Sequence, residues 1–135
     1  MATLTPTLTL ASTDITADET LNLTLTDSLS VLGPCETKRV VVASGSTDVG
    51  ADNTIFANGS YSISYVLLYN TSTAGSGEII TIGTTASAAS LAAENMSLNP
   101  GEFAFFPWDS TVDLVADASS GSPVLEARIF QAASV

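Results

Sequence analysis

The sequence predicts an all-β fold: a single antiparallel β-sandwich or jelly roll of about eight strands, with an extended N-terminal arm. The dominant hydrophobic period is two, as at residues 21–26, where leucines alternate with polar residues. Turn-forming Gly, Pro, Asn and Ser cluster between short apolar segments. The 135 residues suit one domain with its own hydrophobic core. Short strands at this spacing are typical of sandwiches.

The first element, residues 2–12, is a nearly uncharged strand in which threonine alternates with apolar residues. Pro6 restricts it to an edge or an arm, because proline cannot donate to the hydrogen-bond ladder of a sheet. The segment completes either its own sheet, which we favour, or the sheet edge of a neighbouring molecule. We assign residues 1–20 to an N-terminal strand or arm and residues 21–135 to the β-sandwich domain.

The remaining strands follow the same alternation. We expect them at residues 21–26, 38–44, 61–69, 78–83, 102–106, 111–116 and 124–131. Turn signals lie at residues 32–34, 58–59, 74–77, 99–101 and 119–123. Residues 86–95 are rich in alanine, which favours helix, so we expect a short helix or a loop over one end of the sandwich there.

The longest expected strand, residues 61–69, carries apolar residues on both faces of its second half. Tyrosines and aliphatic residues share one face, while Val66 and Leu68 extend the other face, which begins with serines. We therefore expect this half to be buried on both sides, under either a loop or the N-terminal arm, or under another subunit. Residues 40–42, three consecutive valines, present the same alternatives.

An aromatic cluster follows the predicted turn at residues 99–101, where proline and glycine suit the central positions of a type II turn. In the strand after it, we expect Phe103 and Phe105 to share the core face. Phe106 lies on the opposite face, so another part of the chain or another molecule must bury its side chain. We expect the next residue, a proline, to end the strand pairing and to turn Trp108 toward the end of the sandwich.

The absence of histidine removes the commonest acid-base group and metal ligand. It excludes Ser-His-Asp and Cys-His catalysis and zinc sites built from His and Cys. Carboxylate-only chemistry, as in glycoside hydrolysis, needs a paired set of acids. The candidates are Glu78, Glu102, Asp109, Asp113 and Glu126, and solvated strand ends and sheet faces are the preferred interpretation. We therefore predict no enzymatic activity and no cofactor.

A loop containing Asp48, Asp52 and Asn53 offers oxygen ligands of the kind that calcium prefers. It lacks the spacing and the closing glutamate of an EF-hand, so we expect an ordinary loop and no metal. Cys35 is the single cysteine and cannot form an internal disulfide. We expect neither a signal peptide nor a membrane-spanning segment, since no stretch has the required pattern.

The net charge of −11, with only three basic residues, argues against a nucleic-acid partner and against an anionic membrane surface. Lys38 and Arg39 open the valine strand, and Arg128 lies in the last strand. Each is expected to pair locally with a carboxylate, for example across the sheet. Lys38 and Arg39 also suit a polar interface.

The order of these features resembles that of small β-sandwich virion proteins of tailed bacteriophages, over residues 37–131. The features are a basic start to a valine strand at 38–42, a Thr-Asp loop at 47–48, a strand ending in Tyr-Asn at 66–70, an Ile-Thr-Ile-Gly strand at 80–83, a Leu-x-Pro-Gly-Glu turn at 98–102, an aromatic strand at 103–107 and a final strand at 124–130. That group includes capsid decoration (cement) proteins and fibre or appendage modules. The resemblance implies a non-enzymatic protein that attaches to a capsid or tail as a symmetric homo-oligomer, with a trimer favoured.

We therefore expect a capsid decoration protein at the virion surface, which contacts the major capsid protein or other virion proteins and stabilises the head shell. The alternative is a fibre, appendage or lectin-like module that binds host glycans, with Trp108 stacking on a sugar beside Asp109 and Ser110. The candidate interface residues are Leu4, Leu8, Leu10, Val66, Leu68, Phe106 and Trp108.

Overall fold

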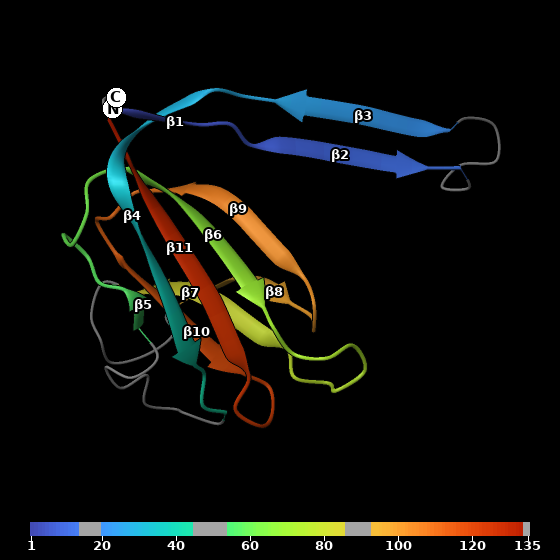
Figure 1. The fold of residues 1–135 in the computed structure, drawn as a ribbon. Helices are drawn as coiled ribbons and strands as arrows, with labels where there is room; N and C mark the ends of the chain where they lie inside the picture. Colours follow the sequence, from blue (N-terminus) through green and yellow to red (C-terminus); the bar gives the residue numbers. More distant parts are fainter. Residues whose placement is uncertain (14–19, 45–53, 86–92, 134–135) are drawn as a thin grey trace.

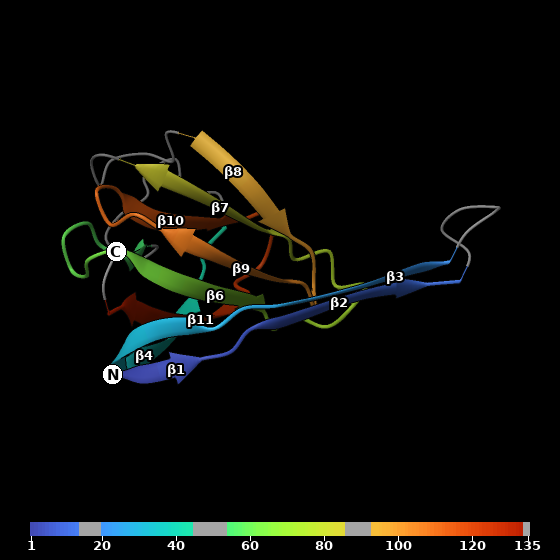
Figure 2. The same ribbon diagram turned by 90° about the horizontal axis from the view of Figure 1, so that it is seen from above.

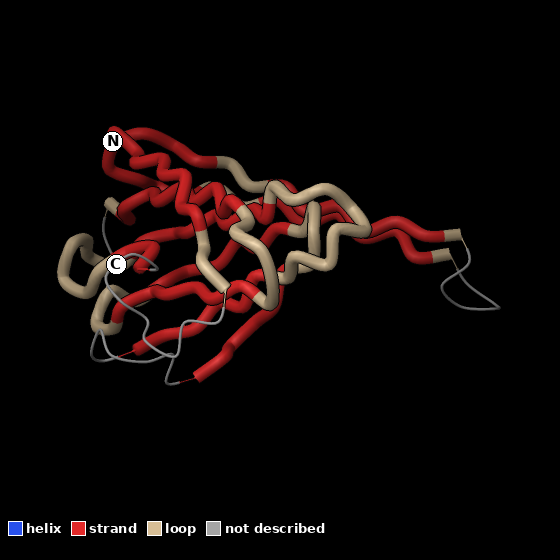
Figure 3. Tube along the Cα trace, turned by 90° about the horizontal axis from the view of Figure 1, so that it is seen from below, coloured by secondary structure: helices blue, strands red, loops and turns tan. Residues whose placement is uncertain are grey.

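The computed structural model describes residues 1–13, 20–44, 54–85 and 93–133. All the secondary structure in these ranges is β-strand, and the strands of each sheet pair in an antiparallel manner. Two sheets face each other, and a two-stranded hairpin projects from one end of them (Figures 1 and 2). Figure 3 shows the strands and connecting loops from below, the side opposite to the view of Figure 2. The described residues form eleven strands in three sheets, where the sequence predicts about eight in one sandwich.

The first sheet has the strand order β1-β4-β11-β6-β9, and the second has the order β5-β10-β7-β8. The strands of the first sheet are β1 (Ala2–Leu4), β4 (Leu29–Val41), β11 (Val124–Ala132), β6 (Ser64–Asn70) and β9 (Phe103–Trp108). Those of the second are β5 (Thr54–Phe56), β10 (Asp113–Ala118), β7 (Ile80–Thr85) and β8 (Ala93–Leu98). Neighbours in each sheet are mostly distant in sequence, so the core closes through long-range pairing.

The third sheet is the hairpin of β2 (Thr7–Ser12) and β3 (Leu21–Thr26), which we call the arm. The chain leaves the sandwich along β1 and β2 and returns along β3 and β4. At the base of the arm, the Asp27 amide donates to the Pro6 carbonyl at 3.2 Å. A domain boundary between residues 20 and 21 therefore cuts the arm in two, because β3 pairs with β2 and not with the sandwich.

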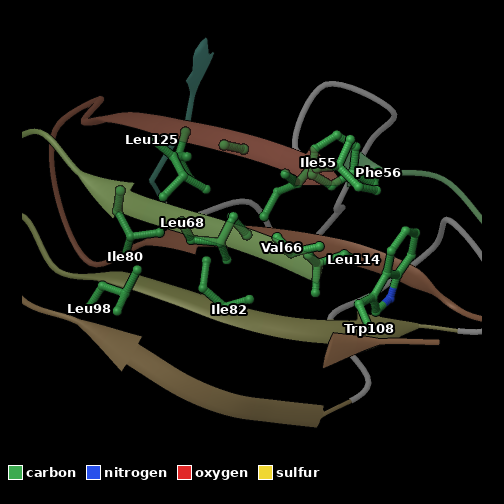
Figure 4. Packing of buried hydrophobic residues seen from close by; sticks show 14 of the residues in the cluster. Ile55, Phe56, Val66, Leu68, Ile80, Ile82, Leu98, Trp108, Leu114 and Leu125 are labelled. Atoms are coloured by element: carbon green, nitrogen blue, oxygen red, sulfur yellow. The ribbon is translucent and has the colours of Figure 1, made fainter. Parts of the chain in front are cut away.

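The hydrophobic core lies between the two facing sheets (Figure 4). Val66 and Leu68 are fully buried in it, and Trp108 is only 5% exposed. The Trp108 ring lies 6.0 Å from the Phe56 ring, centroid to centroid. Phe106 is partly buried and packs against the same cluster. These four residues, proposed above as interface candidates, therefore serve the core of their own domain.

The two faces of β6 differ in burial, whereas the sequence predicted that its second half is buried on both sides. Ser64, Val66, Leu68 and Asn70 alternate into the core, while the intervening tyrosines and Leu67 lie on the outer face. The second half of this strand is therefore covered on one side only. Valines 40–42 also alternate: Val42 is buried, Val40 packs against the core, and Val41 is exposed.

The faces of β9 are the reverse of those predicted, since Phe103 and Phe105 were expected on the core side. Phe106 lies directly opposite Val66 in the register of β9 and β6. Because directly opposite residues of an antiparallel pair share a face, Phe106 points inward with Val66. Phe103 and Phe105 consequently point outward and are exposed. The strand does not end at Pro107, as was expected, but continues to Trp108. Proline is tolerated there because β9 is an edge strand, so the missing N–H can face away from the sheet.

Two other expectations differ. The predicted turn at residues 32–34 lies inside β4, where a register shift opposite Ile129 and Gln131 marks a bulge. Strands β5 and β8 were not expected, and residues 93–95 of the alanine-rich segment belong to β8 rather than to a helix. The rest of that segment lies outside the described residues.

The turn at the start of β9 is confirmed. The Glu102 amide donates to the Asn99 carbonyl at 2.9 Å, and Gly101 has a φ of 83°, as the third position of a type II turn requires. The Glu102 carboxylate accepts hydrogen bonds from the Asn99 amide at 2.8 Å and from its Nδ2 at 3.1 Å. These bonds lower the pKa of Glu102 below its ordinary value of 4.5.

This carboxylate makes a pH-dependent contribution to stability. Because the pKa is lower in the folded state, the contribution is complete above pH 4.5 and is lost as the pH falls through the folded value. We expect Glu102→Gln to lower the urea midpoint slightly at pH 7, and by less at pH 3. A difference of the same size at both pH values would show that ionisation of Glu102 does not matter.

Candidate interaction surface

The outer face of the first sheet carries an aromatic and aliphatic surface on β6, β9 and the end of β11. We call it the outer apolar face, and it consists of Tyr65, Leu67, Tyr69, Phe103, Phe105 and Phe130. Leu67 lies opposite Phe105 in the strand register, and the rings of Tyr65 and Phe105 stack with centroids 6.2 Å apart. The most exposed member is Phe103, at 63%.

The arm has one apolar face and one polar face. Leu8 lies opposite Leu25, and Leu10 lies opposite Leu23, so the four side chains form one continuous leucine face. Their side chains are between 39% and 56% exposed. Threonines line most of the other face, where the hydroxyl groups of the opposite residues Thr7 and Thr26 are 3.3 Å apart.

Two open grooves join the base of the arm to the outer apolar face. One, of about 490 Å³, is lined by Leu4, Pro6, Thr7, Leu8, Leu67, Phe103, Phe105 and Phe130. The other, of about 590 Å³, is lined by Pro6, Leu8, Leu25, Thr26, Asp27, Leu29, Tyr65, Phe105 and Pro107. Only one lining residue, Asp27, carries a charge. The leucine face and the outer apolar face are thus parts of one nearly uncharged surface, which is the usual mark of a contact site.

In the described part of the chain, two ion pairs lie on β11 and β4, and only the one on β11 is beside the apolar surface. Arg128 donates to the Glu126 carboxylate at 2.7 Å, along the same strand rather than across the sheet. Lys38 pairs with Glu36 at 3.1 Å on the neighbouring strand. Both pairs are solvent-accessible and contribute little to stability. The Arg128–Glu126 pair lies on the outer side of the sheet, next to Tyr69 and Leu67 in the register. Lys38 instead shares the core-facing side of β4 with Val40, and its Nζ donates to the Ile55 carbonyl at 3.5 Å.

The carboxylates proposed for catalysis do not form one site. Glu102 is engaged in its turn, Glu126 pairs with Arg128, and Asp109 is exposed next to the start of another turn. Asp113 is buried, contrary to the expected outward orientation, and accepts the Asn58 amide at 2.6 Å. Within the described ranges, no three His, Cys, Asp or Glu residues lie close enough to hold a metal ion. The loop with Asp48, Asp52 and Asn53 lies outside those ranges.

The candidate residues therefore divide into two groups. Leu4, Leu8 and Leu10 lie at the base of the arm or on its leucine face. Val66, Leu68, Phe106 and Trp108 belong to the core, so Trp108 is not available to stack on a sugar. Leu23, Leu25 and the outer apolar face were not predicted from the sequence. Two neighbouring uncharged strands of equal length, both with alternating leucines, were the signal for the hairpin.

Among the described residues, no helix has the length and apolar character needed to cross a membrane. Comparison of the chain with protein-family models, with the sequences of curated proteins and with solved structures finds no match. The described chain consists of two facing sheets, a projecting arm and a nearly uncharged apolar surface that joins the arm to the first sheet.

Proposed function

We propose that this chain is a non-enzymatic virion structural protein, a decoration (cement) protein that lies on the capsid surface as a homo-oligomer and stabilises the head shell. The single observation that carries the proposal is the arm, whose leucine face is uncovered. A two-stranded hairpin is at best marginally stable in water on its own. An arm of this kind is therefore best accounted for by a contact with another molecule.

The strand order supports the proposal. The eight strands from β4 onward form two facing groups of four, β4-β11-β6-β9 and β5-β10-β7-β8. We propose that this is a jelly roll, to which β1 and the arm are additions. Jelly rolls are frequent among viral capsid and lectin domains, so the fold suits either proposed role without choosing between them.

Burial of the leucine face supplies the energy for such a contact. Complete burial of one leucine contributes about 1.5–3 kcal/mol. The four leucines are about half exposed, so covering them would contribute on the order of 3–6 kcal/mol per arm. A cement protein acts in this way, because any molecule that binds only the assembled shell stabilises it by mass action.

The test is binding to shells assembled from the major capsid protein of the same genome. The intact chain is compared with an arm-excised chain, in which a two-residue Asn-Gly turn replaces residues 7–26. The hydrogen bond between Pro6 and Asp27 already has the geometry that such a turn closes, so β1 and β4 remain paired. We expect the intact chain to bind and to raise the melting temperature of the shell, and the arm-excised chain to do neither. Failure of the intact chain to bind would overturn the decoration role.

A second candidate is a fibre or appendage module that binds host glycans. Its supporting observation is the pair of exposed rings, Tyr69 and Phe103, which lie opposite each other beside the ion pair of Glu126 and Arg128. Aromatic faces next to charged hydrogen-bonding groups suit sugar recognition. A glycan array separates the candidates: binding that Tyr69→Ala removes would support this one, and an array without signal would remove it.

A further inference from the structure

We infer that the partner of the arm is a second copy of this chain: the leucine face of one arm packs on the outer apolar face of the next copy. This inference names the partner of the arm. Its biological role, a homo-oligomer on the capsid, rests on the proposed function. The contact itself is argued from the geometry of a single chain and would form without a capsid.

The arm cannot cover its own leucine face completely. Leu8 and Leu25, at its base, line the grooves against the sheet, whereas Leu10 and Leu23 line neither of them. Figures 1 and 2 show the reason, since β2 and β3 run outward beyond the end of the sandwich. The outer half of the leucine face therefore needs a surface from outside its own subunit.

The outer apolar face matches the arm in size and in side-chain type. Strands β2, β3 and β9 each have six residues, which corresponds to about 20 Å of extended chain. A hairpin laid on this face would form a third layer, with the two backbones about 10 Å apart as in packed sheets. Leucines would then fill the grooves beside Phe103 and Phe105, which are open in the single chain.

Charge selects another copy rather than an unrelated surface. The chain carries a net charge of −11, so most contacts between two copies would be repulsive. The strands of the arm contain no charged residue, and neither does the lining of the groove beside Phe103. These are surfaces on which two acidic copies can meet without bringing like charges together.

The contact joins two different patches, the arm of one copy and the outer apolar face of another. Such heterologous contacts close into rings when the rotation between copies permits. A trimer of the kind proposed above is one such ring. The assembly would fail if either patch were damaged, and copies with complementary damage would still be able to form one contact.

Complementation is the direct test. The arm-excised chain keeps the outer apolar face, and a Phe103→Asp chain keeps the arm. We expect each variant alone to be monomeric by light scattering and their equimolar mixture to form a 1:1 heterodimer. Val41→Asp is the matched control: Val41 is 61% exposed, lies on the same sheet and lines neither groove, so the mass of the intact assembly should not change.

A photo-crosslinking experiment tests the contact without damaging the outer apolar face. A benzophenone probe is attached to residue 10 of a Cys35→Ser, Leu10→Cys chain, which is mixed with isotope-labelled copies. We expect cross-links from the probe to β6 or β9 of another copy, and far fewer when the probe is at residue 9 in a Thr9→Cys chain.

Three results would overturn the inference: a monomeric intact chain, no heterodimer in the mixture of folded variants, or an arm-excised chain that keeps the mass of the intact assembly. The inference would also be overturned if the intact chain bound neutral phosphatidylcholine vesicles through its arm but did not associate with other copies of itself. If heterodimers form while the intact chain fails to bind shells, only the decoration role fails. If a monomeric chain binds shells through its arm, only this inference fails.

Discussion

Replacing Leu10 and Leu23 with aspartate is expected to convert the assembly to monomers. The two residues lie opposite each other on the leucine face, on the part of the arm that its own sandwich does not cover. Removing a carboxylate from water costs several kcal/mol, so two aspartates would exceed what the leucine face gains by burial. Sedimentation equilibrium of the variant should give the mass of one chain, 13.8 kDa for the unmodified sequence.

The matched control places the same charges on the other face of the arm. Thr9 and Thr24 form the adjacent cross-strand pair, so Thr9→Asp with Thr24→Asp adds two charges one residue away. We expect this variant to keep the mass of the wild type. Dissociation of both variants to the same extent would show that the net charge of the arm, and not its leucine face, governs assembly.

Asn70→Asp is expected to destabilise the folded domain by about 3–5 kcal/mol at neutral pH, the cost of leaving a buried charge without a partner. Asn70 is fully buried at the end of β6. Its Nδ2 donates to the carbonyls of Glu78 at 2.9 Å and Leu98 at 3.0 Å, and its Oδ1 accepts the Ser72 amide at 3.1 Å. An aspartate has the same shape, but its carboxylate would face two carbonyl oxygens with nothing to donate.

The pH dependence of this variant distinguishes lost hydrogen bonds from a buried charge. Burial raises the pKa of the new carboxyl group in the folded state, so its destabilisation grows as the pH rises above the unfolded value and shrinks in acid. Urea unfolding at pH 7 and pH 4 measures this change. Asn22→Asp, at an exposed position on β3, is the control and should show little effect at either pH. An Asn70→Asp chain as stable as the control would contradict the role of this network.

The class of fold could be predicted because local chemistry determines it. Alternation with a period of two predicted most of the strands, and the proline and glycine before Glu102 predicted the turn that is observed. The inward face of a strand could not be predicted in the same way where both faces are apolar. In β9 the register with β6 decides it, since Phe106 lies opposite the buried Val66.

The pairing of β3 and the extent of β4 could not be predicted from the local sequence either. Residues 21–26 have the alternation of a sandwich strand, yet they pair with β2 outside the sandwich. Gly33 and Pro34 are typical turn residues, but a bulge accommodates them within β4. Residues 21–26 were predicted as a strand, but their pairing with β2 was not. Residues 29–37 were not predicted as a strand, and they form one by pairing with β1 and β11.

The most direct test of the uncovered leucine face as an intermolecular contact is the solution mass of the intact and arm-excised chains, measured side by side at increasing concentration. We predict that the intact chain has the mass of two or more whole chains of 13.8 kDa, and that the arm-excised chain is a folded monomer. An intact chain that remains monomeric up to high micromolar concentration, or an arm-excised chain that still assembles, would contradict the account.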